Sequence, residues 1–172
     1  MNYTKDQLVA LHPYSSNTIC LAMRTRSGKH PKQIGCNATN LINVPITPCN
    51  GTAVQNVSIG IINCRSIFNK SDETSDVVKN KDLDALAIAK TWLTGNVSDQ
   101  RIVGDVTPAG YSFHHAVRIH KKGGGVCIII RDSLKCETHL RFQAKSFENC
   151  QLTFVSGGMS VRVTIFLPIR PH

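Results

Sequence analysis

The chain has 172 residues, enough for one ordinary domain with a core, and 41% of them are hydrophobic. Its net charge of +9 suits a polyanionic partner such as DNA or RNA, although the basic residues are spread along the chain rather than gathered in one run. The seven cysteines include no Cys-x-x-Cys pair, so we expect free thiols and no structural zinc site.

No apolar run in the sequence approaches the roughly 18 residues that a membrane span needs. The first residues lead into no hydrophobic signal-peptide core. We therefore expect an intracellular protein, without a signal peptide or a transmembrane segment, that has no membrane partner.

The first third of the sequence predicts little regular structure. Residues 1–56 lack sustained hydrophobic periodicity, and prolines and turn signals such as Asn50-Gly51 recur in them. We expect residues 1–56 to be a mostly disordered or irregular N-terminal arm, and residues 57–172 to form the folded domain.

The domain is expected to begin with a strand, a helix and a second strand. Residues 57–63 have a largely apolar centre, typical of a strand buried on both faces. Residues 66–80 predict a helix capped by Ser66, and residues 85–89 predict another buried strand. This order favours a parallel pair of strands.

Short strands are expected to follow a loop at residues 94–110. Antiparallel hairpins are the natural connection between them. The predicted strands are residues 111–117, 126–130, 136–142, 147–154 and 161–167. Gly123, Gly124 and Gly125 precede one of these strands and lack the spacing of a phosphate-binding loop, so they predict a tight hairpin with close backbone packing.

Few single residues indicate chemistry. Asn63 ends an apolar strand, where mixed sheets present functional side chains, but its position alone favours a polar residue that bonds to nearby backbone. Trp92, the only tryptophan, is expected to pack in the core or to anchor a loop. No nucleophile–base triad is legible. The candidates for nucleic-acid contacts are the basic residues Arg65, Arg118, Lys121 and Lys122.

Six short motifs follow one another between residues 57 and 171. They are Ile62-Asn63-Cys64-Arg65-Ser66, Ala89-Lys90-Thr91-Trp92-Leu93, Pro108-Ala109-Gly110-Tyr111 with Arg118, Gly123-Gly124-Gly125-Val126, Ser146-Phe147-Glu148, and Arg170-Pro171. Each is weak alone. Their order and spacing resemble the N-terminal half of the apurinic-type endonuclease domain of non-LTR (LINE-type) retrotransposons, in the endonuclease/exonuclease/phosphatase superfamily.

The resemblance implies a fold and an ancestral activity. The fold would be of the α+β or α/β class, a partial four-layer α/β sandwich that is truncated before its second half. The ancestral activity would be nicking of DNA with Mg²⁺, a hard ion that prefers oxygen ligands, above all carboxylates. A nuclear location is also implied by the DNA target of the family.

Carried over residue by residue, little of the catalytic site remains. Asn63 matches the metal-binding Asn of the family, but Lys90 stands at the position of its metal-binding Glu. Ile169 stands at the position of its Tyr, before Arg170-Pro171. The later Asp, Asn and His motifs have no counterpart, so no catalytic residue is intact and no Mg²⁺ is expected to bind well.

We therefore expect a degenerate, truncated endonuclease-like domain without nuclease activity. One alternative is a non-catalytic basic module that binds DNA or RNA, and another is a remnant open reading frame with no selected function. Because the resemblance predicts that strands of the second sheet are missing, the apolar face of the first sheet is expected to lack its partner, which favours self-association.

Overall fold

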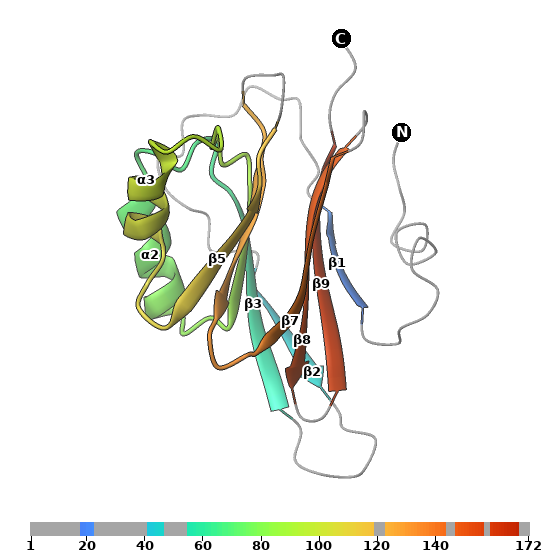
Figure 1. Cartoon of the computed structure of the whole chain (residues 1–172). Helices are drawn as coiled ribbons and strands as arrows, with labels where there is room; N and C mark the ends of the chain where they lie inside the picture. Colours follow the sequence, from blue (N-terminus) through green and yellow to red (C-terminus); the bar gives the residue numbers. More distant parts are fainter. Residues whose placement is uncertain are drawn as a thin grey trace, which may run out of the picture.

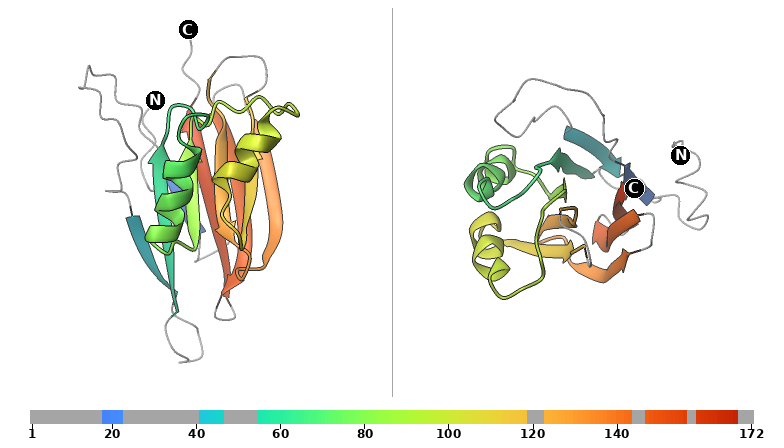
Figure 2. Two further views of the ribbon diagram at one scale, coloured as in Figure 1. Left: turned by 90° about the vertical axis from the view of Figure 1, so that its left-hand side faces the viewer. Right: turned by 90° about the horizontal axis from the view of Figure 1, so that it is seen from above.

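The computed structural model describes residues 18–22, 41–46, 55–118, 123–143, 147–156 and 159–168. These residues form two β-sheets and two helices, arranged in three layers with both helices on the outer face of one sheet (Figures 1 and 2). The content is mixed but mostly strand, which is compatible with the α+β class. Among the described residues no helix is long and apolar enough to cross a membrane.

The sheet next to the helices has five strands, in the order β2-β3-β4-β6-β5. Their bounds are β2 Leu41–Ile46, β3 Gln55–Asn63, β4 Ala85–Ala89, β5 Tyr111–Ala116 and β6 Val126–Arg131. The predicted parallel pair is confirmed, because β3 and β4 run parallel, while the other neighbours are antiparallel. Every residue of β4 is buried, as a continuous apolar run between two covered faces requires.

The second sheet has four strands, in the order β1-β9-β8-β7. Their bounds are β1 Thr18–Ala22, β7 Cys136–Gln143, β8 Phe147–Ser156 and β9 Met159–Pro168. The predicted hairpins are confirmed, since β7 with β8 and β8 with β9 pair antiparallel. Strand β1 comes from far away in the sequence and pairs parallel with β9.

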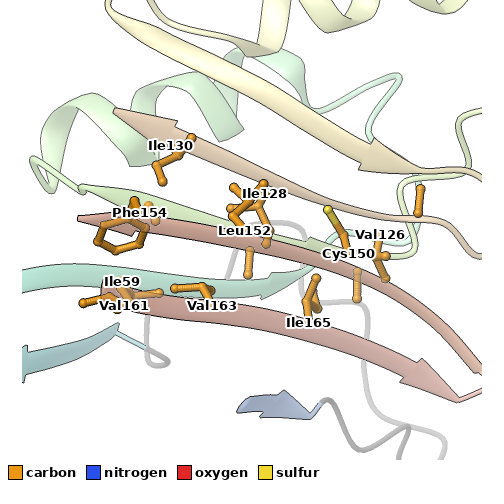
Figure 3. Packing of buried hydrophobic residues seen from close by; sticks show 14 of the residues in the cluster. Ile59, Val126, Ile128, Ile130, Cys150, Leu152, Phe154, Val161, Val163 and Ile165 are labelled. Carbon is orange, nitrogen blue, oxygen red and sulfur yellow. The ribbon is translucent and has the colours of Figure 1, made fainter. Parts of the chain in front are cut away.

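The main core lies between the two sheets. On β9, alternation places Val161, Val163 and Ile165 on one face, where they join a cluster with residues of β3, β6 and β8 (Figure 3). The inner face of the five-stranded sheet is thus covered by the second sheet. The expectation that this face lacks a partner is wrong, because β7, β8 and β9 supply the opposing strands. Self-association stays a prediction, but it loses this argument.

The outer face of the five-stranded sheet is covered by α2 (Ser71–Asn80) and α3 (Asp99–Val106). Buried residues of both helices, among them Val78 and Val106, join a second cluster with Leu86 and Ile88 of β4 and Ile129 of β6. Helix α3 falls within the segment predicted to be a loop. Its first residue, Asp99, accepts hydrogen bonds from the backbone N–H groups of Thr94 and Gly95, at 2.6 and 2.7 Å.

Helix α2 begins at Ser71 rather than at Ser66. Arg65 and Ser66 have φ angles of 52° and 109°, which an α-helix cannot accommodate. The N–H of Ser66 instead donates to the carbonyl of Lys90, at 2.8 Å. A tertiary hydrogen bond therefore displaces the start of the helix.

Strands β1 and β2 lie within residues 1–56, where no strand was predicted. Both are edge strands of their sheets, and β2 contains Pro45, which an edge strand tolerates because one of its sides carries no ladder. The rest of residues 1–54 lies outside the described residues, so the prediction of an irregular arm there stays a prediction.

Candidate functional site

The strands β3 and β4 end side by side. Their parallel register pairs Asn63 with Ala89, so that Lys90, the next residue, emerges beside Asn63. Strand β6 runs antiparallel to this direction and β5 runs along it, so that the end of β5 and the start of β6, paired as Ala116 and Val126, lie at the same end of the sheet. We refer to this end of the sheet, formed by residues 63–68, 89–93, 117–118 and 123–125, as the carboxyl edge. It is the upper end of the sheet in Figure 1.

The two chain segments that leave β3 and β4 continue to pair beyond the strands. The N–H groups of Cys64, Ser66 and Ile67 donate to the carbonyls of residues 89, 90 and 91, at 3.2, 2.8 and 3.0 Å. Lys90 itself has a φ of 59°, as unusual for a side-chain-bearing residue as the values at Arg65 and Ser66. Left-handed residues of this kind persist where the surroundings hold them, and they cluster at functional sites.

The three glycines close the carboxyl edge. All have positive φ, from 75° to 86°, and the carbonyls of Gly124 and Gly125 accept hydrogen bonds from the N–H groups of Trp92 and Thr91, at 2.9 and 3.2 Å. A Cβ added to Gly125 would lie 2.5 Å from the Thr91 hydroxyl oxygen. The predicted close backbone packing is therefore confirmed. The hairpin between β5 and β6 is not tight, because nine residues, 117–125, separate Ala116 from Val126.

A buried ion pair fastens the glycine segment to the second sheet. Glu148, the second residue of β8, is fully buried and accepts hydrogen bonds from the guanidinium of Arg118 and from the N–H of Gly125, the latter at 2.7 Å. The Arg118 side chain is only 15% exposed. Its charge is thus compensated inside the fold, which counts against the predicted role of Arg118 as a phosphate contact. Sequence reasoning noticed Glu148 within a motif but assigned it no partner.

The structure places the remaining predicted residues as follows. Asn63 and Arg65 are exposed at the carboxyl edge, and Lys90 is partly buried there. Trp92 is 47% exposed, so a place in the core is wrong for it, and it contacts the glycine segment instead. The predictions for Lys121, Lys122 and Ile169 concern positions outside the described residues.

The side chains present at the carboxyl edge do not fit a divalent metal. In the described part of the chain, no group of three or more His, Cys, Asp and Glu side chains is arranged to hold an ion. Asn63 offers one amide oxygen, Lys90 adds an ammonium, and the Glu148 carboxylate is occupied by Arg118 and Gly125. Mg²⁺ is bound in proteins mainly by carboxylates, which are missing from the solvent-exposed part of this edge.

The net positive charge is unevenly distributed along the sequence. Basic and acidic residues nearly balance in the described ranges, so most of the +9 charge falls in the intervening segments. Four of these segments are next in sequence to strand ends at the carboxyl edge. These strand ends are the end of β5 and the ends that contain the pairs Ala22↔Phe166, Leu41↔Gly60, Gln143↔Glu148 and Phe147↔Pro168. The basic residues of these segments are Arg24, Arg26, Lys29, Lys32, Lys121, Lys122, Lys145 and Arg170.

At the opposite end, residues 47–54 and 157–158 join strands and carry no charged residue, but residues 132–135, which join β6 to β7, carry Asp132 and Lys135. Asp72 and Glu73, exposed in the first turn of α2, are the acidic residues closest in sequence to the turn after β3. The segments next in sequence to the carboxyl edge are therefore basic, whereas the opposite end of the sheet carries charges of both signs.

No protein-family model matches the chain, and no curated protein sequence matches it.

Proposed function

We propose that the chain is a degenerate relative of the retrotransposon endonuclease domain that lacks metal-dependent nuclease activity. The observation that carries this proposal is the pairing of Asn63 with Ala89, which sets Lys90 beside Asn63 at the carboxyl edge. By the resemblance, these are the positions of the Asn and the Glu that bind metal in the family. The metal ion and the ammonium group of Lys90 would then compete for the same place.

The substitution changes the chemistry of the edge in two ways. A lysine removes the carboxylate that would supply most of the affinity for Mg²⁺, and its own charge repels the ion. Without the ion, the attacked phosphate loses charge stabilisation and positioning, which is worth orders of magnitude in rate. We therefore expect no cleavage of nucleic acid, even where nucleic acid binds to the chain.

The fold is compatible with this proposal. The β3–α2–β4 unit opens the five-stranded sheet, and two packed sheets with helices on one outer face correspond to layers expected of an endonuclease/exonuclease/phosphatase sandwich.

The test is a nicking assay on supercoiled plasmid with Mg²⁺, joined to a titration of the metal by calorimetry. We expect no nicking by the chain, and weaker Mg²⁺ binding by the chain and by Lys90→Gln than by Lys90→Glu, which restores the carboxylate. Gln has nearly the shape of Glu without its charge, so it is the matched control. Mg²⁺-dependent nicking by the unaltered chain that disappears in Asn63→Ala would overturn the proposal.

A second candidate function is a non-catalytic module that binds DNA or RNA. The observation that favours it is that the segments next in sequence to the carboxyl edge carry basic and no acidic residues, while the opposite end carries charges of both signs. Lys and Arg residues in these segments would attract a phosphate backbone, and each phosphate contact releases counterions.

This second candidate is tested by the salt dependence of binding to a fluorescent oligonucleotide. We expect the affinity to fall steeply with salt, with a slope of about 0.9 per phosphate contact on logarithmic axes. The double variant Lys121→Ala/Lys122→Ala should weaken binding and lower the slope. The control Lys79→Ala/Lys81→Ala removes the same charge from the exposed end of α2, and equal losses in both variants would contradict a localised surface.

Both candidates presuppose a folded chain, whereas a remnant without selected function does not. A cooperative thermal transition followed by circular dichroism separates these cases.

A further inference from the structure

The carboxyl edge exposes aromatic side chains. Large hydrophobic residues of the described ranges are mostly buried, and those that are exposed are Phe68, Trp92, Val97 and Val155. Phe68 and Trp92, at 38% and 47% exposure, follow Ile67 and Thr91, whose backbones are joined by a hydrogen bond of 3.0 Å. The two aromatic residues therefore leave the edge of the sheet from neighbouring positions.

The backbone of Trp92 is held by a hydrogen bond, whereas nearly half of the residue is exposed. Its φ is 62°, and its N–H donates to the carbonyl of Gly124, so the backbone is fixed in an uncommon conformation. A Cβ added to Gly123 would lie 3.3 Å from the indole nitrogen. The absence of a side chain at Gly123 thus gives the indole room to rest against the backbone, while nearly half of the residue stays exposed.

A basic residue accompanies the aromatic pair. Arg65 is exposed. The next residue, Ser66, donates its N–H to the carbonyl of Lys90, and Lys90 precedes Trp92 by two positions. A base can stack on an exposed indole, and a guanidinium can contact the adjoining phosphate. Exposed aromatic and cationic residues on neighbouring segments are a combination that proteins use to bind single-stranded nucleic acid.

We propose that the carboxyl edge binds single-stranded nucleic acid, with an unpaired base stacked on the indole of Trp92 and a phosphate near Arg65. This inference rests on the nucleic-acid-binding candidate function and specifies its ligand. Duplex DNA does not match the aromatic pair, because its bases already stack on one another and its phosphates need only positive charge. Stacking also tolerates any base, so no sequence preference is expected from this contact.

Because Trp92 is the only tryptophan, its fluorescence reports directly on this contact. At low salt, we expect an oligothymidylate to quench the emission of the unaltered chain, and a blunt duplex of the same length to quench it much less. Thymine oligonucleotides form little structure of their own, so their bases are available to stack. This measurement needs no variant and does not depend on the folding of one.

Binding of the same oligonucleotides is measured separately by the anisotropy of a label on the nucleic acid. Trp92→Leu should weaken binding of the single strand about 5- to 150-fold, the equivalent of about 1–3 kcal/mol for one stacked base, and leave duplex binding nearly unchanged. Val155→Ser, at an exposed apolar position in β8, is the matched control and should bind as the unaltered chain does. Thermal melts of both variants check that they fold.

The outcomes separate this inference from the function on which it rests. Single-strand binding with quenching that Trp92→Leu weakens supports the inference. Salt-sensitive binding without quenching, and with no effect of Trp92→Leu, overturns the stacking contact but leaves a phosphate-binding module intact. No binding of either oligonucleotide overturns both.

Discussion

The two ends of the five-stranded sheet are stabilised in different ways. The carboxyl edge combines left-handed residues, three glycines and one buried ion pair, whereas the opposite end holds a partly exposed network of charges around Arg131. In that network Arg131 has several partners, and Asp84 contacts both Arg131 and the N–H of Ser58. Most positive-φ residues with side chains lie at the carboxyl edge, although Asp82 at the opposite end also has a φ of 46°.

At the opposite end, Arg131 has several partners. The guanidinium of Arg131 contacts the carboxylates of Asp82, at 2.6 Å, and Asp84, at 3.1 Å, and lies 5.1 Å from the ring centroid of Tyr111. Asp84 also accepts a hydrogen bond from the N–H of Ser58, at 2.9 Å. The hydrogen bond with Asp82 raises the pKa of Arg131 above its ordinary value, so the guanidinium stays charged at every relevant pH.

The largest expected effect comes from removing the buried carboxylate at the carboxyl edge. Glu148→Ala leaves the Arg118 charge buried without its partner and the N–H of Gly125 without an acceptor, and should lower the free energy of unfolding by about 3–5 kcal/mol. Asp84→Ala is the matched change at the opposite end and should cost about 1–3 kcal/mol, because Arg131 keeps Asp82. Urea denaturation measures both, and equal losses would contradict the contrast between the ends.

A smaller effect is expected from adding one methyl group to a glycine. Gly125→Ala forces a Cβ to within 2.5 Å of the buried Thr91 hydroxyl, whereas Gly110, with a similar φ of 81°, has open space around it. Gly110→Ala should therefore cost about 1–2 kcal/mol from backbone strain alone. Gly125→Ala should cost about 1–3 kcal/mol more, because Thr91 is β-branched and cannot move aside easily. Indistinguishable unfolding midpoints would show that the contact at Gly125 relaxes freely.

The smallest expected effect concerns Tyr111 at the opposite end and depends on pH. Burial raises the pKa of Tyr111 above its ordinary value of 10.0, against the lowering effect of Arg131, and its hydroxyl donates to the carbonyl of Leu83 at 2.8 Å. Tyr111→Phe should cost about 1 kcal/mol at neutral pH by loss of this hydrogen bond.

The sign of the pH dependence follows from the direction of the shift. The unfolded chain releases the phenolic proton more readily, so the stability contributed by the protonated Tyr111 is present below about pH 10 and is lost as the pH rises through the folded-state pKa. The difference between the two proteins should therefore shrink above that pH. Burial also raises the pKa of Cys127 well above its usual value, but this contribution is common to both proteins. If the difference in stability between the unaltered chain and Tyr111→Phe grew with pH, the raised pKa of Tyr111 would be contradicted.

Local patterns predicted much of the sheet structure. The apolar runs at residues 57–63 and 85–89 marked β3 and β4, and their separation by a helix indicated the parallel pair that the register confirms. The alternation in residues 161–167 marked β9 and its inward face. These signals are readable because the period of hydrophobicity within a few residues reflects the face that each element buries.

Other elements were missed for a physical reason that they share. Strands β1 and β2 acquire their structure by pairing with β9 and β3, and α3 packs Val106 into the cluster on the outer face of the five-stranded sheet. The start of α2 moved because a carbonyl after β4 took the N–H of Ser66. Each of these depends on partners distant in sequence, which override weak local preference.

Some features of the candidate site follow from the sequence, and others depend on contacts between distant segments. The sequence alone determined that Lys90 stands where the resemblance places a carboxylate, because residue identity is all that this statement needs. Only the tertiary structure decided that Lys90 lies beside Asn63, that Arg118 is held by Glu148, and that Trp92 faces solvent against Gly123. Partnership and exposure are properties of contacts between segments about 20 to 30 residues apart or more, which no local pattern specifies.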